Sequence, residues 1–214
     1  TYGLSHEAGY NASNVRTEGM KTRFIVSENG QPMQEITLNM PGAHNVQNAV
    51  GAIALARQLN VDYSVIGSAL ASFKGIHRRF ELRGEKSGVM VFDDYAHHPS
   101  EIRAALATAK SALEGRRVIV VFQPHRYSRV RDSFNDFAES FQDADALICA
   151  EIYAASEQPI PGISGRALFE KIAEKRSNCF FFEDRKQIVD FLASECKSGD
   201  AVITVGAGDV NQTC

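Results

Sequence analysis

Three short polar segments carry the side chains most capable of chemistry in this sequence of 214 residues. They are GAHNVQN at 42–48, DDYAHHP at 93–99 and QPHRYSR at 123–129. Their amides, carboxylates, imidazoles and guanidinium groups are the hydrogen-bonding groups that recognise phosphates, carboxylates and the edges of purine rings. Each segment has both a structural and a functional interpretation.

The first segment combines a glycine with two asparagines. Gly42 permits a backbone conformation that other residues avoid. Asn45 and Asn48 are three residues apart, so both amides can face one side of a helix start, where they suit a purine edge or a phosphate-bearing ligand. The alternative is a helix cap plus a surface asparagine, and local chemistry alone favours that simpler interpretation.

The second segment follows an apolar run and contains two aspartates and two histidines. Asp93, Asp94, His97 and His98 could orient a ribose, hold a cation through water or contact an amino-acid substrate. A direct metal site is not predicted, because Mg²⁺ prefers oxygen ligands and adjacent residues do not easily converge on one ion. The alternative is a turn with a capping Asp and one packed His. The position at a strand end favours function.

The third segment places basic side chains where a helix is predicted to begin. His125, Arg126 and Arg129 are unfavourable there for the helix itself, because that end already carries partial positive charge. A bound anion would offset this cost, and arginine binds a carboxylate through two parallel hydrogen bonds. The pattern therefore favours an anion site over a solvated basic loop.

Alternating strands and helices are predicted to position the second and third segments. The expected strands are Gly88–Phe92, Arg117–Phe122, Ala146–Ala150, Cys179–Phe182 and Ala201–Val205. The expected helices are Pro99–Leu113, Arg129–Phe141, Gly165–Lys175 and Lys186–Cys196. Continuous apolar runs such as VIVVF are typical of strands covered on both faces. The pattern indicates a doubly wound, mostly parallel α/β fold, in which ligands bind beyond the carboxyl ends of the strands.

The first eighty residues have a different organisation. Strands at Thr22–Val26 and Glu35–Leu38, joined through an Asn-Gly turn, predict a hairpin. Apolar residues at helical spacing from Asn45 to Leu59 and over Tyr63–Phe73 predict two helices. We place a domain boundary near Glu81, so Arg79 would lie at the junction, where it could reach a phosphate or form an ion pair.

Composition excludes several classes of protein. A hydrophobic share of 44%, a charged share of 23% and a net charge of −3 are typical of a soluble globular protein and argue against a general nucleic-acid binder. No apolar stretch approaches the roughly 20 residues that span a bilayer. The four cysteines form no C-x-x-C pair, which suits a reducing, cytoplasmic compartment. Because the chain starts at Thr1 rather than Met, we expect a fragment.

In their order along the chain, PGAHNVQNA, RRFE, DDYAHHP, QPHRYSR and a final GAG resemble the Mur ligase family. The resemblance implies ATP-dependent formation of an amide bond through an acyl phosphate, in peptidoglycan precursor synthesis. QPHRYSR is most similar to the members that join L-alanine to UDP-N-acetylmuramate. The alternatives are a murein-tripeptide recycling ligase, which also carries DDYAHHP, and a non-catalytic α/β module that binds a nucleotide or another anion.

The resemblance also implies roles for domains and residues. Residues 1–80 would be the end of a central ATP-binding domain, and residues 81–214 would be the carboxyl-terminal domain. Site residues by this matching are His44, Asn45 and Asn48 for ATP; Arg79 and Asp94 for ATP and catalysis; His98 for catalysis; and His97, His125, Arg126 and Arg129 for the substrate. The family's Gly-Lys-Thr or Gly-Lys-Ser phosphate loop does not occur in this sequence. We therefore expect the Mg²⁺ ligands elsewhere and this chain alone to be inactive.

Overall fold

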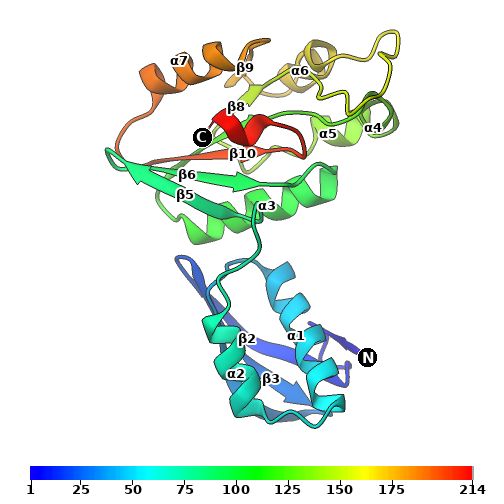
Figure 1. Ribbon diagram of the computed structural model, residues 1–214, viewed down its shortest axis with the longest axis vertical. Helices are drawn as coiled ribbons and strands as arrows, with labels where there is room; N and C mark the ends of the chain where they lie inside the picture. Colours follow the sequence, from blue (N-terminus) through cyan, green and yellow to red (C-terminus); the bar gives the residue numbers. More distant parts are fainter. Residues whose placement is uncertain (214) are drawn as a thin grey trace. The chain divides into compact units, whose positions relative to one another are not determined.

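The structure is a computed structural model that describes residues 1–213, and these form two compact units (Figure 1). The first unit comprises Thr1–Gly75 together with Ser111–Glu114. The second comprises Ile76–Lys110 together with the described chain from Gly115 onward. The chain thus leaves the first unit after Gly75, a few residues before the boundary expected near Glu81.

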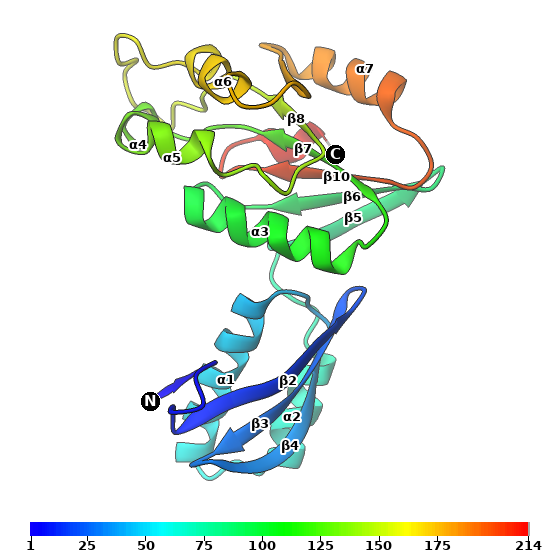
Figure 2. The same cartoon turned by 180° about the vertical axis from the view of Figure 1, so that it is seen from behind.

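The first unit is a four-stranded sheet with two helices on one face (Figure 2). Its elements are β1 (Tyr2–Gly3), β2 (Tyr10–Glu18), β3 (Lys21–Glu28), β4 (Gln31–Leu38), α1 (Ala43–Gln58) and α2 (Tyr63–Ser72). The predicted β3–β4 hairpin is confirmed, and Asn29 (φ 49°) and Gly30 (φ 79°) adopt the left-handed conformations that a tight hairpin turn requires. The unpredicted β2 is buried only at its first three residues, so its sequence carries little apolar signal.

The core of the first unit forms where two periodicities meet. Phe24 and Val26 alternate along β3, and Ile36 and Leu38 alternate along β4, so their side chains share one face of the sheet. That face packs against the apolar stripe of α1, which includes the fully buried Ile53. The first helix predicted from apolar spacing is thus confirmed as α1. Packing of its apolar stripe on the sheet fixes the position of its first turn.

The second unit is a six-stranded sheet in the order β5-β6-β10-β7-β8-β9. The strands are β5 (Glu81–Lys86), β6 (Val89–Asp94), β7 (Arg117–Phe122), β8 (Ala146–Cys149), β9 (Cys179–Phe181) and β10 (Asp200–Val205). The helices are α3 (Pro99–Ala112), α4 (Tyr127–Asp132), α5 (Phe134–Ala138), α6 (Gly165–Ala173) and α7 (Arg185–Glu195), followed by a short 3-10 helix at Val210–Thr213. Only β5 runs antiparallel to its neighbour, so the predicted mostly parallel sheet is confirmed.

Helices cover both faces of this sheet, as a doubly wound fold requires. Ile119 and Val121 of β7 belong to a buried cluster that includes Ile188 of α7. The alternate residue Phe122 instead contacts Phe137 of α5, with ring centroids 5.7 Å apart. Figure 2 shows α3, α5 and α6 in front of the sheet. Burial on both faces accounts for the uninterrupted apolar runs of the strands.

Two elements differ from expectation. The helix predicted over Arg129–Phe141 is two short helices, because Ser133 (φ −123°, ψ 24°) leaves the helical conformation and its carbonyl oxygen starts the next turn. The unpredicted edge strand β5 (ELRGEK) is exposed at five of its six residues and has no apolar alternation. Among residues 1–213, no helix has the length and apolar character needed to cross a membrane.

Candidate functional site

Two of the three polar segments come together at the carboxyl edge of the second unit's sheet. β6 ends at Asp94 and β7 ends at Phe122, and both strands flank the parallel strand β10. The imidazole ring of His97 lies 4.8 Å from that of His98 and 5.9 Å from that of His125, measured between ring centroids. This edge is where open α/β sheets bind ligands.

The two aspartates at the end of β6 are directed into the protein. Asp93 is 1% exposed and accepts hydrogen bonds from the Arg78 guanidinium (2.8 Å) and the Thr204 hydroxyl (2.7 Å). Asp94 is 6% exposed, and its two oxygens accept from the N–H groups of Phe80 and Ala96, each at 2.8 Å. Burial raises the pKa of Asp94, although these two N–H groups oppose the shift. Asp94 therefore fixes the backbone around the site, and Asp93 holds the Arg78 side chain.

Two neighbouring arginines have different surroundings. Arg78 donates to Asp93 and to the carbonyl oxygen of Gly206 (2.7 Å), so it joins the end of β6 to the loop after β10. Arg79 is exposed, and its guanidinium carbon lies 5.7 Å from the centre of the Tyr95 ring. Arg79, the predicted nucleotide ligand, is therefore the one of the two that faces solvent.

His97 is held in one tautomer by its neighbours. Its Nδ1 lies 2.8 Å from the carbonyl oxygen of Tyr95, which can only accept, so the neutral ring carries its proton on Nδ1 and presents the lone pair of Nε2. Glu101 accepts from the N–H groups of His97 (2.9 Å) and His98 (3.2 Å), which caps the start of α3. Burial alone would raise the pKa of Glu101, but these N–H groups together with the nearby His97 and Arg79 side chains lower it.

His125 has the opposite tautomer. Arg129 donates through Nη1 to the Nδ1 of His125 (3.0 Å) and to its carbonyl oxygen (2.9 Å). Because a guanidinium can only donate, the neutral ring of His125 carries its proton on Nε2. Burial, together with the charge of Arg129, lowers the pKa of His125 to about 4. Burial and Arg129 also lower the pKa of His98. His125 is therefore uncharged near neutral pH.

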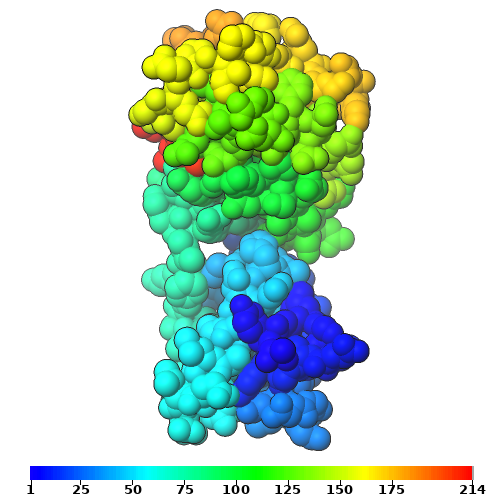
Figure 3. All heavy atoms as spheres, turned by 90° about the vertical axis from the view of Figure 1, so that its right-hand side faces the viewer, coloured from blue at the N-terminus to red at the C-terminus, as the bar shows by residue number. Residues whose placement is uncertain are grey.

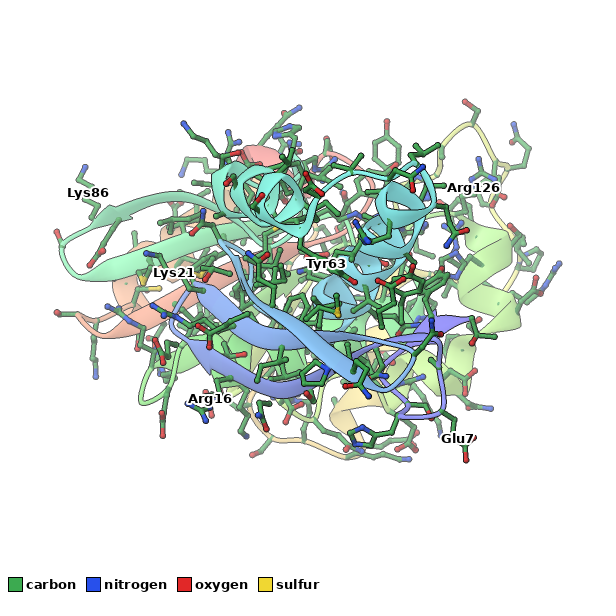
Figure 4. All side chains as sticks on the ribbon, turned by 90° about the horizontal axis from the view of Figure 1, so that it is seen from below. Glu7, Arg16, Lys21, Tyr63, Lys86 and Arg126 are labelled. Atoms are coloured by element: carbon green, nitrogen blue, oxygen red, sulfur yellow. The ribbon has the colours of Figure 1, made fainter. Side chains whose placement is uncertain are left out.

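Arg126 occupies the position before the first residue of α4 with an unusual backbone. Its φ of 71° and ψ of 132° are rarely adopted by a residue with a side chain. The side chain is exposed (Figure 4). Burial and the charge of Arg126 lower the pKa of Arg129. An anion between these two guanidinium groups would relieve their repulsion.

Two residues that the sequence interpretation missed lie in the loop after β8. The ring of Tyr153 stacks on that of His125 with centroids 5.6 Å apart and planes 8° from parallel. Glu157 accepts from the backbone N–H (3.0 Å) and hydroxyl (2.6 Å) of Ser128. Both residues come after the carboxyl end of a buried strand. The same position identified the other polar segments, so the sequence did contain a signal for these two residues.

The first segment lies in the other unit, at the start of α1. Gly42 precedes the helix with a φ of 101°, and no side chain caps that end. Asn45 donates instead to the carbonyl oxygen of Pro41 (2.6 Å). His44 and Asn48 are exposed. The simpler interpretation expected a helix cap plus a surface asparagine. The side-chain cap is not formed, and Asn48 is the asparagine that faces solvent.

A pocket of about 300 Å³ lies at the same edge of the second unit. The loops after β7, β8 and β10 and the start of α7 line it, with Gln123, Tyr153, Arg185 and Asp209 among its residues. Asp209 accepts hydrogen bonds from Arg185 (2.5 Å) and from the side-chain amide of Gln123 (2.9 Å). The polar side chains that line the pocket therefore largely bind one another. Within residues 1–213, no three His, Cys, Asp or Glu side chains group as a metal site.

A family model described as the Mur ligase, glutamate ligase domain matches residues 78–208, more than half of the chain. The chain belongs to the Mur ligase family. The resemblance carried by the polar segments is thereby confirmed. The matched range contains the whole cluster at the carboxyl edge of the second unit, from Arg78 to Gly208.

Named Mur ligases match nearly the whole chain. The UDP-N-acetylmuramate–L-alanine ligases of Trichlorobacter lovleyi and Geobacter sulfurreducens are 47% and 44% identical, over 99% and 100% of this chain. The chain covers 47% and 46% of these relatives, so it spans about half their length.

Solved structures agree on the fold. The UDP-N-acetylmuramate–alanine ligase of Thermotoga maritima superposes with a TM-score of 0.86 at 30% identity, covering 100% of this chain and 45% of that one. A murein peptide ligase of Psychrobacter arcticus gives 0.65 at 26% identity, with coverage of 99% and 44%. The expected α/β Mur ligase fold is confirmed.

Proposed function

We propose that this chain is the carboxyl-side part of a UDP-N-acetylmuramate–L-alanine ligase, a cytoplasmic enzyme of peptidoglycan precursor synthesis. The observation that carries the proposal is the cluster of His97, His125, Arg126 and Arg129 at one sheet edge, where two imidazoles have opposite tautomers beside two guanidinium groups. The relatives of that name at 44–47% identity support it. The domain assignment within the longer enzyme, with the central ATP-binding domain ending near residue 80, belongs to the proposal.

The basic side chains would bind the carboxylate of L-alanine. Arg126 and Arg129 supply the charge, and the Nε2–H of His125 supplies a neutral donor. A carboxylate has two oxygens and about four lone pairs, so it can accept from all three groups. Binding would also relieve the repulsion between the arginines that lowers the pKa of Arg129. The negative charge of the substrate would thus balance the positive charge of the two arginines.

His97 would act on the amine end of the amino acid. Alanine in solution is an ammonium ion, and it attacks a carbonyl only after losing a proton. The Nε2 lone pair of His97 is a suitable acceptor, because its Nδ1–H is committed to the Tyr95 carbonyl oxygen. The exposed His98, in ring contact with His97, would pass the proton to solvent. This is the role that we propose for the predicted catalytic His98.

We assign the nucleotide-binding residues from the family resemblance. Arg79 is the exposed arginine of its pair and suits a phosphate, while His44, Asn45 and Asn48 would contact the nucleoside. Asp94 would contribute by fixing the backbone at Phe80 and Ala96. The substrate carboxylate would attack the γ-phosphate of ATP, and the alanine amine would then displace phosphate from the acyl phosphate. Mg²⁺ would lower the charge repulsion between these groups, and we propose that its ligands lie outside this chain.

The proposal can be tested in the full-length ligase by following phosphate release while each substrate is varied in turn. Arg126→Lys keeps the charge but loses the planar fork, so the KM for L-alanine should rise about ten-fold, the scale of one charge-assisted hydrogen bond. The KM for ATP should stay within about two-fold. Arg131→Lys is the matched control, because Arg131 lies on the same helix and pairs with Asp132 at the surface.

Two results would overturn the proposal. One is phosphate release that depends on a murein tripeptide rather than on L-alanine, which would favour the recycling ligase. The other is an unchanged alanine KM in a folded Arg126→Lys enzyme, which would leave the basic segment as a solvated loop.

A further inference from the structure

The loop between β8 and α6, residues 150–164, holds the basic segment at two points. Tyr153 contacts His125 and Arg126, and Glu157 contacts Ser128. The loop is coloured yellow-green to yellow in Figure 3, where it forms part of the surface of the second unit. The loop thus touches the residues proposed to bind the amino acid.

Tyr153 continues the sheet beyond the ends of its strands. Its N–H donates to the carbonyl oxygen of Pro124 (2.8 Å), and its carbonyl oxygen accepts from the N–H of Arg126 (2.9 Å). His125 and Tyr153 consequently face each other as an isolated parallel bridge. Their rings stack almost in parallel on the same side. The backbone pairing is independent of the Tyr153 side chain, so the ring contributes a separable contact.

The segment needs such support because Arg126 is strained. A left-handed φ of 71° persists in a residue with a side chain only when the surroundings enforce it. The N–H of Arg126 is bound to Tyr153, and the next turn is fixed by the bonds from Ser128 to Glu157. The direction of the Arg126 side chain therefore depends on the loop after β8.

The loop after β10 also lies against Tyr153. Gly208, in the loop after β10, lies so close that a Cβ at this position would be 2.7 Å from Cγ of Tyr153, which real atoms do not tolerate. Tyr153 thus lies close to the Gly208 backbone as well as to the imidazole of His125. Packing against Tyr153 therefore explains why the second glycine of the GAG sequence at 206–208 has no side chain.

We propose that Tyr153 is a positioning residue that sets the affinity of the site for the amino-acid carboxylate by holding the His125 ring in place. The inference rests on the proposed ligase function. Tyr153 is 40% exposed, and its ring is not required by the hydrophobic core. Stacking on Tyr153 restricts the orientation of the His125 ring, whose Nδ1 is bound by Arg129, and so fixes the direction of the Nε2–H that would donate to the carboxylate.

Kinetics of the full-length ligase test this role. Tyr153→Leu keeps the backbone pairing, but its smaller side chain has no aromatic face and covers less of the His125 ring. The KM for L-alanine should rise at least about five-fold with the KM for ATP unchanged. Tyr153→Phe keeps the stacking and should restore the alanine KM to within about two-fold of wild type. Phe181→Leu is the control, because Phe181 is a half-buried ring on β9 that packs against Phe169 instead.

A second measurement does not depend on catalysis. In the present chain, the His125 imidazole can be titrated by NMR in the presence of its titratable neighbours Arg126, Arg129, His97 and Glu157. Because burial is the largest cause of its low pKa, the midpoint should rise toward 6.5 in Tyr153→Leu and stay low in Tyr153→Phe.

The outcomes separate the two proposals. Absence of alanine-dependent turnover in the wild-type ligase defeats the proposed function, whatever Tyr153 does. With turnover present, equal effects of Tyr153→Leu on the KM of all substrates, or an unchanged alanine KM, overturn the positioning role. An unchanged His125 midpoint in a folded Tyr153→Leu chain overturns it as well.

Discussion

Replacing Asp94 by asparagine should destabilise the second unit. The carboxylate is 6% exposed, and each oxygen accepts one backbone N–H at 2.8 Å, from Phe80 and from Ala96. An asparagine side chain of the same shape has only one acceptor oxygen. In either orientation its NH₂ group faces one of the two N–H donors, which loses its partner.

The expected cost follows from these contacts. Losing one charge-assisted hydrogen bond costs about 1.5–3 kcal/mol, and weakening the other to a neutral bond adds about 1 kcal/mol. Part of this is offset, because asparagine avoids the burial penalty that raises the pKa of Asp94. We therefore expect a net loss of about 2–4 kcal/mol in the free energy of unfolding.

Urea unfolding of the present chain, followed by circular dichroism, measures this change. Asp190→Asn is the control, because Asp190 is 63% exposed, pairs with Lys186 on the surface of α7 and should contribute less than about 0.5 kcal/mol. A change within about 0.5 kcal/mol for Asp94→Asn would falsify the view that this carboxylate is a backbone clamp. Such a result would favour a direct role of Asp94 in ligand binding.

Three further predictions can be tested. Asn48→Ala in the full-length ligase should raise the KM for ATP more than that for L-alanine, because a lost amide contact costs about 1–3 kcal/mol, and equal effects on all substrates would indicate a folding defect instead. The present chain alone should hydrolyse no ATP, since its sequence has no Gly-Lys-Thr or Gly-Lys-Ser loop, and steady phosphate release that depends on UDP-N-acetylmuramate would contradict this. The pKa of His125 falls on folding from 6.5 to about 4, so the unfolded chain takes up the proton first. The contribution of His125 to stability should be constant above pH 6.5 and decrease between pH 6.5 and about 4. In urea unfolding at a series of pH values, the free energy of unfolding should therefore fall less steeply over this range in His125→Gln, and an equally steep fall would contradict this.

The strand–helix alternation of the second unit could be predicted because burial on both faces leaves a strong sequence signal. β7 begins and ends at the predicted residues, and α3 and α6 begin at the predicted ones. β2 and β5 escaped prediction because few of their residues are buried and they carry no alternation of apolar side chains. Where burial does not select the residues, the sequence of a strand does not differ from that of a loop.

Sequence alone determined which residue types gather at the carboxyl edge, because parallel strands bring the residues after their ends to one side of the sheet. It could not decide which of those residues face a ligand. Arg78 and Arg79 are adjacent and chemically alike, yet folding directs one to Asp93 and Gly206 and leaves the other exposed. Hydrogen-bond partners distant in the chain decide this.

The tautomers of the two histidines were likewise decided only by tertiary structure. His97 donates to a carbonyl oxygen two residues away, whereas His125 accepts from the guanidinium of Arg129. Nothing in the letters of HHP or PHR distinguishes a proton donor from an acceptor, because an imidazole can serve as either. The contact of Tyr153 with His125 joins residues from two different strand ends, so only the register of the sheet and its loops brings them together.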